Sequence, residues 1–228
     1  MKKIFFACDT SSVKTVKKII SQTQTRNLSI GYKFGLQFFY SKFGRKYISN
    51  LKGKIVWLDL KLKDIPNTVS SSIDSLKDLK DVSYLTVHCS GGFEMMKKSK
   101  IAAKKISRKL KILGVTVLTS FNEKSFREVG FSQKIEKIVL QQVKLARKAG
   151  LDGIVCSGYE IKKIKKICKN MEIFVPGVRL DENKRQDQKR VVTPGRAFKD
   201  GASAIVIGRS VTQGNLKKNF QKLIKSID

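Results

Sequence analysis

Short runs of apolar residues, rich in Val, Ile, Leu and Phe, recur along the whole chain. Most of them are continuous rather than alternating with polar residues, which is typical of strands that are covered on both faces in a parallel sheet. The pattern therefore predicts eight strands, at residues 4–8, 29–34, 54–60, 83–88, 112–118, 152–156, 172–175 and 203–207.

Segments with helical periodicity lie between these runs. Val13, Val16 and Ile20 repeat at helical spacing, and residues 135–146 show the same pattern, with Gly150 placed to end that helix. Eight strand–helix units in 228 residues predict an α/β protein. We expect a closed (β/α)8 TIM barrel that forms a single domain over residues 1–228.

Polar and charged residues gather where the predicted strands end, and the C-terminal strand ends of such a barrel carry its chemistry. The residues at these ends are Asp9, Lys33, Asp59, Lys61, His88, Thr119, Ser120, Arg179, Gly208 and Arg209. One rim of the barrel is therefore the predicted site.

The third strand ends in alternating acidic and basic residues, over residues 56–68. Successive side chains of a strand point to opposite faces, so Asp59 and Lys61 are expected to project from the same face and to meet a common ligand. Asp64 lies past the strand end, so it must reach the site from a loop or belong to a neighbouring subunit. Solvated charges at a partly buried strand end are the alternative.

Two features suggest a phosphate site. Gly208 and Arg209 follow the eighth strand, where barrels bind phosphate through backbone N–H groups, and an arginine can add an ionic contact. The polar stretch 178–188, which carries Arg179 and Gln188, is long for a loop of this fold. We expect it to be a lid over an anion, with an ordinary surface loop as the alternative.

His88 is the only histidine of the chain. It is a candidate acid or base, or a strand-end side chain held by neighbouring hydrogen bonds. No group of Cys, His, Asp and Glu has the spacing of metal ligands, so no metal site built by the protein is expected. A Ser-His-Asp pattern is absent as well.

The formal net charge is +30, from 48 Lys and Arg against 18 Asp and Glu. Such an excess favours contact with nucleic-acid phosphates. The lysines are, however, scattered over nearly every predicted helix, as at positions 14, 17 and 18 and again at 162, 163, 165 and 166. Solvated helix faces explain them better than a specific nucleic-acid site.

Cysteine spacing and chain polarity bear on the compartment. Cys8, Cys89, Cys156 and Cys168 show no C-x-x-C pair, and we expect small buried residues in a reducing compartment. Asp9 interrupts the first apolar run well before the length of a signal-peptide core, and no run approaches a membrane span. A soluble, cytoplasmic protein is expected, with no membrane partner.

Several motifs together resemble the orotidine 5′-phosphate decarboxylase family, in its bacterial form. They are Asp59-x-Lys61-x-x-Asp64-Ile65-Pro66-Asn67-Thr68, Leu118-Thr119-Ser120, Pro176-Gly177-Val178-Arg179, the Asp187-Gln188-Lys189-Arg190 segment and Gly208-Arg209-Ser210. The D-x-K-x-x-D core is shared with related sugar-phosphate barrels, whereas the two segments around Arg179 and Gln188 are more specific.

The resemblance implies a cofactor-free loss of CO₂ from orotidine 5′-phosphate, which gives UMP in pyrimidine biosynthesis. Lys33, Asp59 and Lys61 would form an alternating charge network, completed by the Asp64 of a second subunit in a homodimer with shared sites. Lys61 would be the proton donor. The stretch 180–185 is more charged than the family leads one to expect, and Cys8 stands where a leucine is usual.

The same resemblance assigns substrate contacts. Asp9 and Lys33 would hold the ribose hydroxyls, joined by Thr68 of the second subunit, and Thr119 and Ser120 would lie at the pyrimidine. The phosphate would be held by Arg179, Gln188, Gly208 and Arg209.

Two other functions remain open. A magnesium-dependent sugar-phosphate decarboxylase or lyase of the same barrel group shares the D-x-K-x-x-D core, and turnover in EDTA would separate it from the first interpretation. A basic nucleic-acid-binding protein built on a degenerate barrel would instead show tight, salt-sensitive binding and form no UMP.

Overall fold

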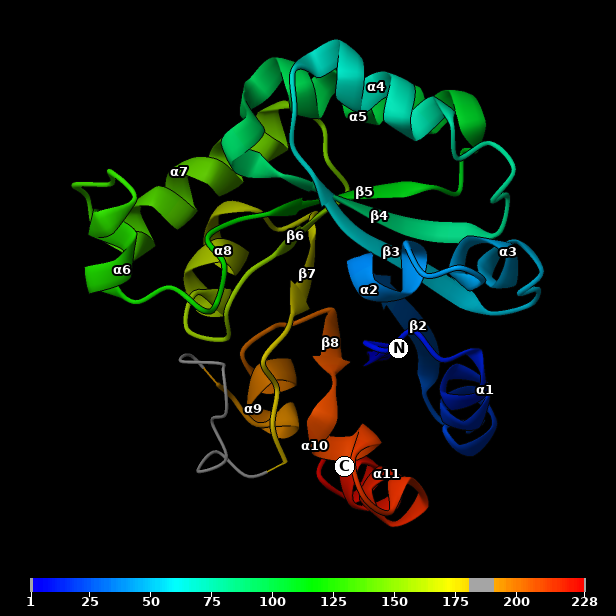
Figure 1. Ribbon diagram of the computed structural model, residues 1–228. Helices are drawn as coiled ribbons and strands as arrows, with labels where there is room; N and C mark the ends of the chain where they lie inside the picture. Colours follow the sequence, from blue (N-terminus) through cyan, green and yellow to red (C-terminus); the bar gives the residue numbers. More distant parts are fainter. Residues whose placement is uncertain (1, 181–190, 228) are drawn as a thin grey trace.

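The computed structural model describes residues 2–180 and 191–227. Eight parallel strands pair in sequence order and close into a barrel (Figure 1). They are β1 (Lys3–Ala7), β2 (Ser29–Gly35), β3 (Ile55–Leu62), β4 (Val82–His88), β5 (Lys111–Val115), β6 (Gly153–Val155), β7 (Glu172–Val175) and β8 (Ala204–Ile207). The predicted (β/α)8 barrel and all eight predicted strands are confirmed.

Helices surround the strands (Figure 1). They are α1 (Val13–Gln22), α2 (Leu36–Phe39), α3 (Gly44–Ser49), α4 (Pro66–Asp74), α5 (Gly92–Ile106), α6 (Glu123–Glu128), α7 (Ile135–Lys148), α8 (Ile161–Ile167), α9 (Pro194–Lys199), α10 (Arg209–Thr212) and α11 (Leu216–Lys225), with a 3-10 turn at Cys89–Gly91. Within the described ranges, every helix is too short or too polar to cross a bilayer.

The two helices predicted from periodicity form as expected. Ser12 caps α1 by accepting a hydrogen bond from the Thr15 backbone N, and α1 buries Val16 and Ile20 against the barrel. Gly150 follows Ala149, the C-cap of α7, and its φ of +76° lies in the left-handed region. Glycine adopts this conformation without strain, so it ends the helix as predicted.

Strand β5 is shorter than predicted, since it ends at Val115 rather than at residue 118. The Thr116 backbone N and Oγ1 both donate to the Val155 carbonyl oxygen, at 3.1 and 3.0 Å. The chain then turns, with a hydrogen bond from the Phe121 backbone N to the Leu118 carbonyl. A continuous apolar run cannot reveal this departure, because residues of the turn remain buried.

An aromatic cluster fills the interior of the barrel. Trp57 packs edge to face with Phe5 and Phe174, with 5.2 Å between ring centroids in each pair, and Tyr84 joins the same cluster. The interior is therefore a packed core rather than a channel, as expected for a TIM barrel. A second and larger apolar core, which holds all four cysteines, lies between the strands and the helices. Burial of the cysteines is thus confirmed.

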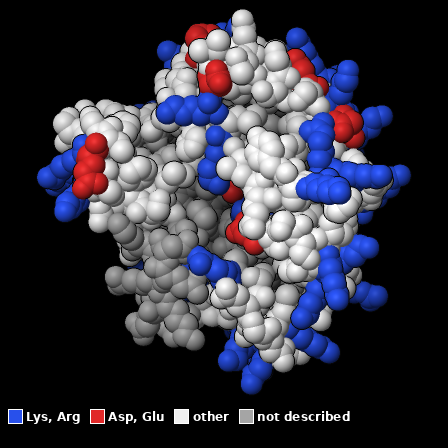
Figure 2. Space-filling view, viewed as in Figure 1, with Lys and Arg blue, Asp and Glu red and all other residues white. Residues whose placement is uncertain are grey.

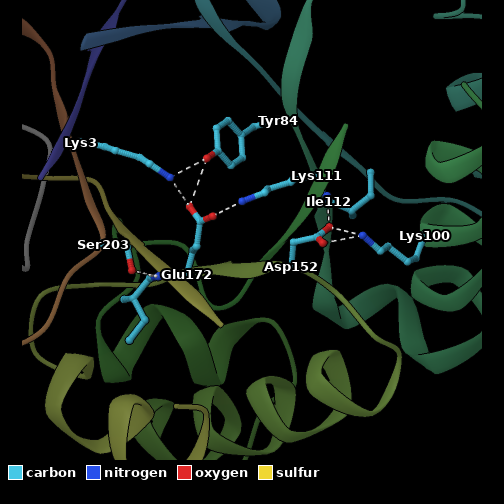
Figure 3. Close-up of polar contacts among 9 residues, drawn as sticks. Lys3, Tyr84, Lys100, Lys111, Ile112, Asp152, Glu172 and Ser203 are labelled. Carbon is cyan, nitrogen blue, oxygen red and sulfur yellow. Dashed lines mark hydrogen bonds and ion pairs between the residues drawn. The ribbon is translucent and has the colours of Figure 1, made fainter. Parts of the chain in front are cut away.

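Below the aromatic cluster, four polar side chains bridge the N-terminal ends of the strands, and we call them the floor cluster (Figure 3). Glu172 accepts hydrogen bonds from Lys3 at 2.9 Å and from the Tyr84 hydroxyl at 3.1 Å, and its other oxygen binds Lys111. Lys3 also donates to the Tyr84 oxygen at 3.0 Å. The floor cluster therefore links β1, β4, β5 and β7.

Candidate active site

A pocket of about 350 Å³ lies at the C-terminal ends of the strands. It is lined by eight residues that the sequence placed in the site, which are Asp9, Lys33, Asp59, Lys61, Thr119, Arg179, Gly208 and Arg209. Figure 2 shows a hollow near the middle of this face, where acidic and basic side chains lie side by side. The topology therefore gathers residues from six of the eight βα units, as the fold requires.

Four charged side chains form a chain along one side of the pocket, and we call them the rim cluster. The Lys33 Nζ lies 3.2 Å from Asp9 Oδ1 and 3.3 Å from Asp59 Oδ2. The Lys61 Nζ donates to the same Asp59 Oδ2 at 2.8 Å. Positive and negative groups thus alternate from Asp9 to Lys61.

Because these side chains are buried, the pKa of each depends on the charges of its neighbours. Burial by itself lowers the pKa of the Lys33 ammonium, but the charges of Asp59 and Asp9 outweigh it and raise that pKa above its ordinary value. Burial likewise favours neutral Asp59, yet Lys33 and Lys61 outweigh it and hold the Asp59 pKa below its usual range. The carboxylate of Asp59 therefore stays ionised between two ammonium groups.

Lys61 reaches this position through an irregular backbone. Its φ of 49° is left-handed, and it is the one non-glycine with positive φ in the described ranges. The pairing of β3 with β4 shifts register between Leu58 and Leu62, so a bulge carries Lys61. Asp59 and Lys61 do meet, but through this bulge rather than through the regular alternation that the sequence predicted.

Thr86 is a residue of this site that the sequence analysis missed. Its hydroxyl accepts a hydrogen bond from the Lys61 backbone N at 2.9 Å and donates to Asp59 Oδ1 at 3.0 Å. The side chain is fully buried in β4. In sequence it is one β-branched residue of an apolar strand, so no signal distinguished it from the core.

Cationic groups lie on the side of the pocket formed by β7 and β8. Arg179 is 5% exposed and lies two residues after Gly177, whose φ of +71° lets the chain turn after β7. The Arg179 backbone N donates to the Val192 carbonyl oxygen, which fixes the described chain on either side of residues 181–190. Gly208 precedes α10, and Arg209 begins it.

Comparisons with known proteins agree with this site. The family model described as "Orotidine 5′-phosphate decarboxylase / HUMPS family" matches residues 2–220. An orotidine 5′-phosphate decarboxylase of Sphingopyxis alaskensis is 40% identical over 93% of this chain and 92% of its own. The enzyme of that name from Carboxydothermus hydrogenoformans is 38% identical over 99% of this chain and 96% of its own. The crystal structure of the Lactobacillus acidophilus enzyme covers 100% of both chains, with a TM-score of 0.86 at 30% identity.

The chain belongs to the orotidine 5′-phosphate decarboxylase family. The resemblance drawn from the motifs is thereby confirmed over nearly the whole chain. The chain is an enzyme, and its class is that of the carboxy-lyases of pyrimidine biosynthesis.

Three described residues that the family resemblance placed in the site are not among those lining the pocket of this chain. Asp64, Thr68 and Ser120 are exposed and lie outside the pocket lining, and Gln188 falls outside the described residues, as does most of the expected lid. Asp64 Oδ1 accepts a hydrogen bond from the backbone N of Ile65 at 2.6 Å. Asp64 is therefore bound to its own backbone and is not part of the pocket lining of its own chain.

Trp57 is a further lining residue that the sequence analysis missed. It shares the apolar part of the pocket wall with Ala7, Leu36, Val155, Pro176 and Val206. A signal was available, because Trp57 precedes Asp59 by two residues in a strand and must share its face. It is the only tryptophan of the chain, so its fluorescence can report on this pocket.

His88 and the cysteines complete the set of candidate groups. His88 ends β4 but does not line the pocket. Burial, reinforced by the charges of Lys61 and Lys63, lowers the pKa of His88, so the imidazole is neutral at neutral pH. Burial raises the pKa of Cys8 and of Cys89 to about 12, which makes both thiols unreactive.

The lysines that the sequence assigned to solvated helix faces are exposed. Lys14, Lys17 and Lys18 project from α1 into solvent, and the lysines at 162, 163, 165 and 166 do so from α8. Figure 2 shows Lys and Arg spread around the periphery of the molecule. This spread matches the interpretation of the excess charge as solvated surface.

Proposed function

We propose that this chain converts orotidine 5′-phosphate to UMP and CO₂ without a cofactor, with Lys61 as the proton donor. The observation that carries the proposal is the Lys61 ammonium, held at 2.8 Å from Asp59 on the wall of a pocket of about 350 Å³. A volume of this size suits one nucleotide-sized ligand.

The reaction breaks the bond between C6 of the pyrimidine and its carboxyl carbon. CO₂ leaves, and the bonding electron pair stays on C6, where no neighbouring group can delocalise it. The Lys61 ammonium faces the pocket in which that charge develops and then gives its proton to C6. One group therefore serves both electrostatic stabilisation and general acid catalysis.

We assign the two ends of the pocket to different parts of the substrate. In this proposal Asp9 and Lys33 bind the ribose hydroxyls, Thr119 contacts the pyrimidine, and Arg179 and Arg209 offer charge to the phosphate. All five residues line the pocket. The phosphate lies far from the bond that breaks. Its binding energy can still raise the rate if it is used to orient the substrate and exclude water.

Independence from metal is supported by the surroundings of Asp59. Its carboxylate already has two ammonium groups at 2.8 and 3.3 Å and the Thr86 hydroxyl at 3.0 Å. A divalent cation bound there would face the repulsion of both ammonium groups. The experiment follows the ultraviolet absorbance of orotidine 5′-phosphate in the presence of EDTA. Undiminished conversion to UMP is expected, whereas activity that requires added Mg²⁺ would favour the lyase interpretation.

A homodimer with shared sites is part of the same proposal. Asp64 and Thr68 lie outside their own pocket, and the Asp64 carboxylate is exposed. Leu36, which lines the pocket, is 50% exposed, and Ile65, which follows Asp64, is 67% exposed. These two side chains are available to pack against a second chain. We therefore assign Asp64 and Thr68 to the site of the second subunit.

Mixing two inactive variants tests this assignment. If Lys61 of one chain acts with Asp64 of the other, Lys61→Ala and Asp64→Ala chains regain activity after subunit exchange. Half of the dimers are then mixed and each has one intact site, which gives about a quarter of the wild-type rate.

A matched mixture of Lys61→Ala with Asp59→Ala chains provides the control. Both residues belong to one rim cluster, so every site of a mixed dimer stays damaged and no recovery is expected. Equal, negligible activity in both mixtures after proven exchange would mean that each site is built within one chain.

A further inference from the structure

We propose that Thr86 is a positioning residue that sets both the Lys61 backbone and the Asp59 carboxylate through one hydroxyl group. The inference rests on the proposed role of Lys61 as the proton donor. Thr86 lies in the middle of β4 and does not line the pocket, so it acts on the chemistry through these two neighbours.

The hydrogen bonds leave the Thr86 hydroxyl only one arrangement. The Lys61 backbone N–H can only donate, so the hydroxyl oxygen accepts that bond at 2.9 Å. The single hydroxyl proton is then directed to Asp59 Oδ1 at 3.0 Å. The other carboxylate oxygen, Oδ2, receives both Lys33 and Lys61.

The backbone of Lys61 needs such support. A lysine with φ of 49° adopts a conformation that is unfavourable for a residue with a Cβ, and such strain persists only where the surroundings enforce it. The register shift between β3 and β4 removes the regular ladder at this point. The Thr86 hydroxyl supplies the missing partner for the Lys61 N–H and so holds the bulge in place.

The Thr86 hydroxyl contacts both the strained backbone of Lys61 and the charged side chain of Asp59. Asp59 is 7% exposed, and it is faced by Lys33 from β2, by Lys61 on its own strand and by His88 from β4, with Asp9 beyond Lys33. A neutral hydrogen bond to the ionised carboxylate favours the charged form. Thr86 therefore supports both the position and the ionisation of the group that holds Lys61.

Three substitutions test the proposal. Thr86→Val keeps the shape of the side chain and removes the hydroxyl, whereas Thr86→Ser keeps the hydroxyl. Thr116→Val is the matched control, because Thr116 is also a buried threonine near a strand end, and its hydroxyl donates only to the Val155 carbonyl oxygen. Turnover of orotidine 5′-phosphate is measured across pH, and UMP binding is followed by Trp57 fluorescence.

We expect Thr86→Val to lower kcat by roughly 10- to 100-fold, the usual effect of losing hydrogen bonds that involve a charged group. The UMP dissociation constant should change by less than about threefold, since the phosphate-side residues lie on β7 and β8. The acidic limb of the kcat profile should move to higher pH, because the Asp59 carboxylate loses a donor. Thr86→Ser should restore most of kcat, and Thr116→Val should behave as wild type.

The inference is overturned if Thr86→Val retains wild-type kcat, or if Thr116→Val lowers kcat as much and leaves the same pH profile. Should Thr86→Val fail to fold, the serine variant decides: it keeps the hydroxyl, so a kcat far below wild type in a folded, UMP-binding protein refutes the proposal. A wild-type protein that leaves orotidine 5′-phosphate unchanged would instead refute the proposed function, independently of Thr86.

Discussion

The two ends of the barrel hold a carboxylate in the same way and put it in different surroundings. At the rim, Asp59 receives two lysines and the Thr86 hydroxyl, and at the floor, Glu172 receives two lysines and the Tyr84 hydroxyl. The contacts of the carboxylate therefore do not explain why the rim, and not the floor, is the candidate active site. The difference must come from backbone conformation, from the burial of the side chains and from the presence of a pocket.

Burial and backbone conformation separate the two clusters. The Asp59 and Lys33 side chains are 9% and 11% exposed, whereas those of Glu172 and Lys3 in the floor cluster are 21% and 28% exposed. Lys61 has a left-handed backbone at a bulge, and its amine faces a pocket. The members of the floor cluster have no positive φ and do not line that pocket. We infer that a cluster of charged side chains can act in catalysis when a strained backbone holds one of its charges at the wall of a ligand pocket.

The largest expected contrast comes from removing the central charge at each end. Asp59→Asn should lower kcat by about 10²- to 10⁴-fold, because Lys61 loses the charge that positions its ammonium. Glu172→Gln should leave kcat within about twofold of wild type, since the floor cluster touches no substrate. Steady-state kinetics of the two variants checks this contrast, and equal losses would show that the rim has no special role.

The same floor variant should be visible in stability. Glu172→Gln is expected to lower the free energy of unfolding by about 1–3 kcal/mol, because Lys3 and Lys111 lose a charged acceptor that is largely removed from water. Urea unfolding measures the change. Glu136→Gln is the control, because Glu136 forms an exposed pair with Lys163 and should shift the free energy of unfolding by no more than about 0.5 kcal/mol. An equal effect of both variants would show that the floor cluster stabilises the protein no more than an exposed ion pair does.

The smallest expected effect is the pH dependence of that stabilisation. Burial alone raises the Glu172 pKa, but hydrogen bonds from Lys111 and Lys3 outweigh it and lower the pKa below its ordinary 4.5. A group of this kind contributes full stability above 4.5 and loses it as pH falls through its folded-state pKa. Hydrogen bonding to Glu172 raises the pKa of Lys111 above 10.5. The contribution of Lys111 to the free energy of unfolding therefore persists up to pH 10.5.

Urea midpoints measured between about pH 3 and about pH 8 check this dependence. The difference in unfolding free energy between wild type and Glu172→Gln should be constant above pH 4.5 and shrink below it. A difference that grows as the pH falls would contradict the assigned sign.

The regular part of the molecule could be predicted from the sequence, because it follows from local patterns. Eight continuous apolar runs indicated a covered parallel sheet, and the helical periods of α1 and α7 were clear. The gathering of Asp9, Lys33 and Arg209 at one pocket followed from topology, since parallel strands end on one side. These inferences needed no knowledge of side-chain contacts.

The irregular part could not be predicted in the same way. The amino-acid sequence of β3 does not indicate a bulge or a left-handed backbone at Lys61, because both depend on the register with β4. Thr86 sits among apolar residues, and only its two hydrogen bonds distinguish it from the core. The position of Asp64 depends on a second chain in our proposal, so the fold of one chain leaves it outside the pocket.

Single-turnover conversion of orotidine 5′-phosphate by Lys61→Ala tests the central claim most directly, with Lys111→Ala as the matched loss of a lysine at the floor. Trp57 fluorescence first establishes that each variant is saturated with nucleotide. We predict that Lys111→Ala forms UMP at close to the wild-type rate, while Lys61→Ala is slower by at least about 10⁴-fold. A saturated Lys61→Ala enzyme that forms UMP at a near wild-type rate would contradict the account.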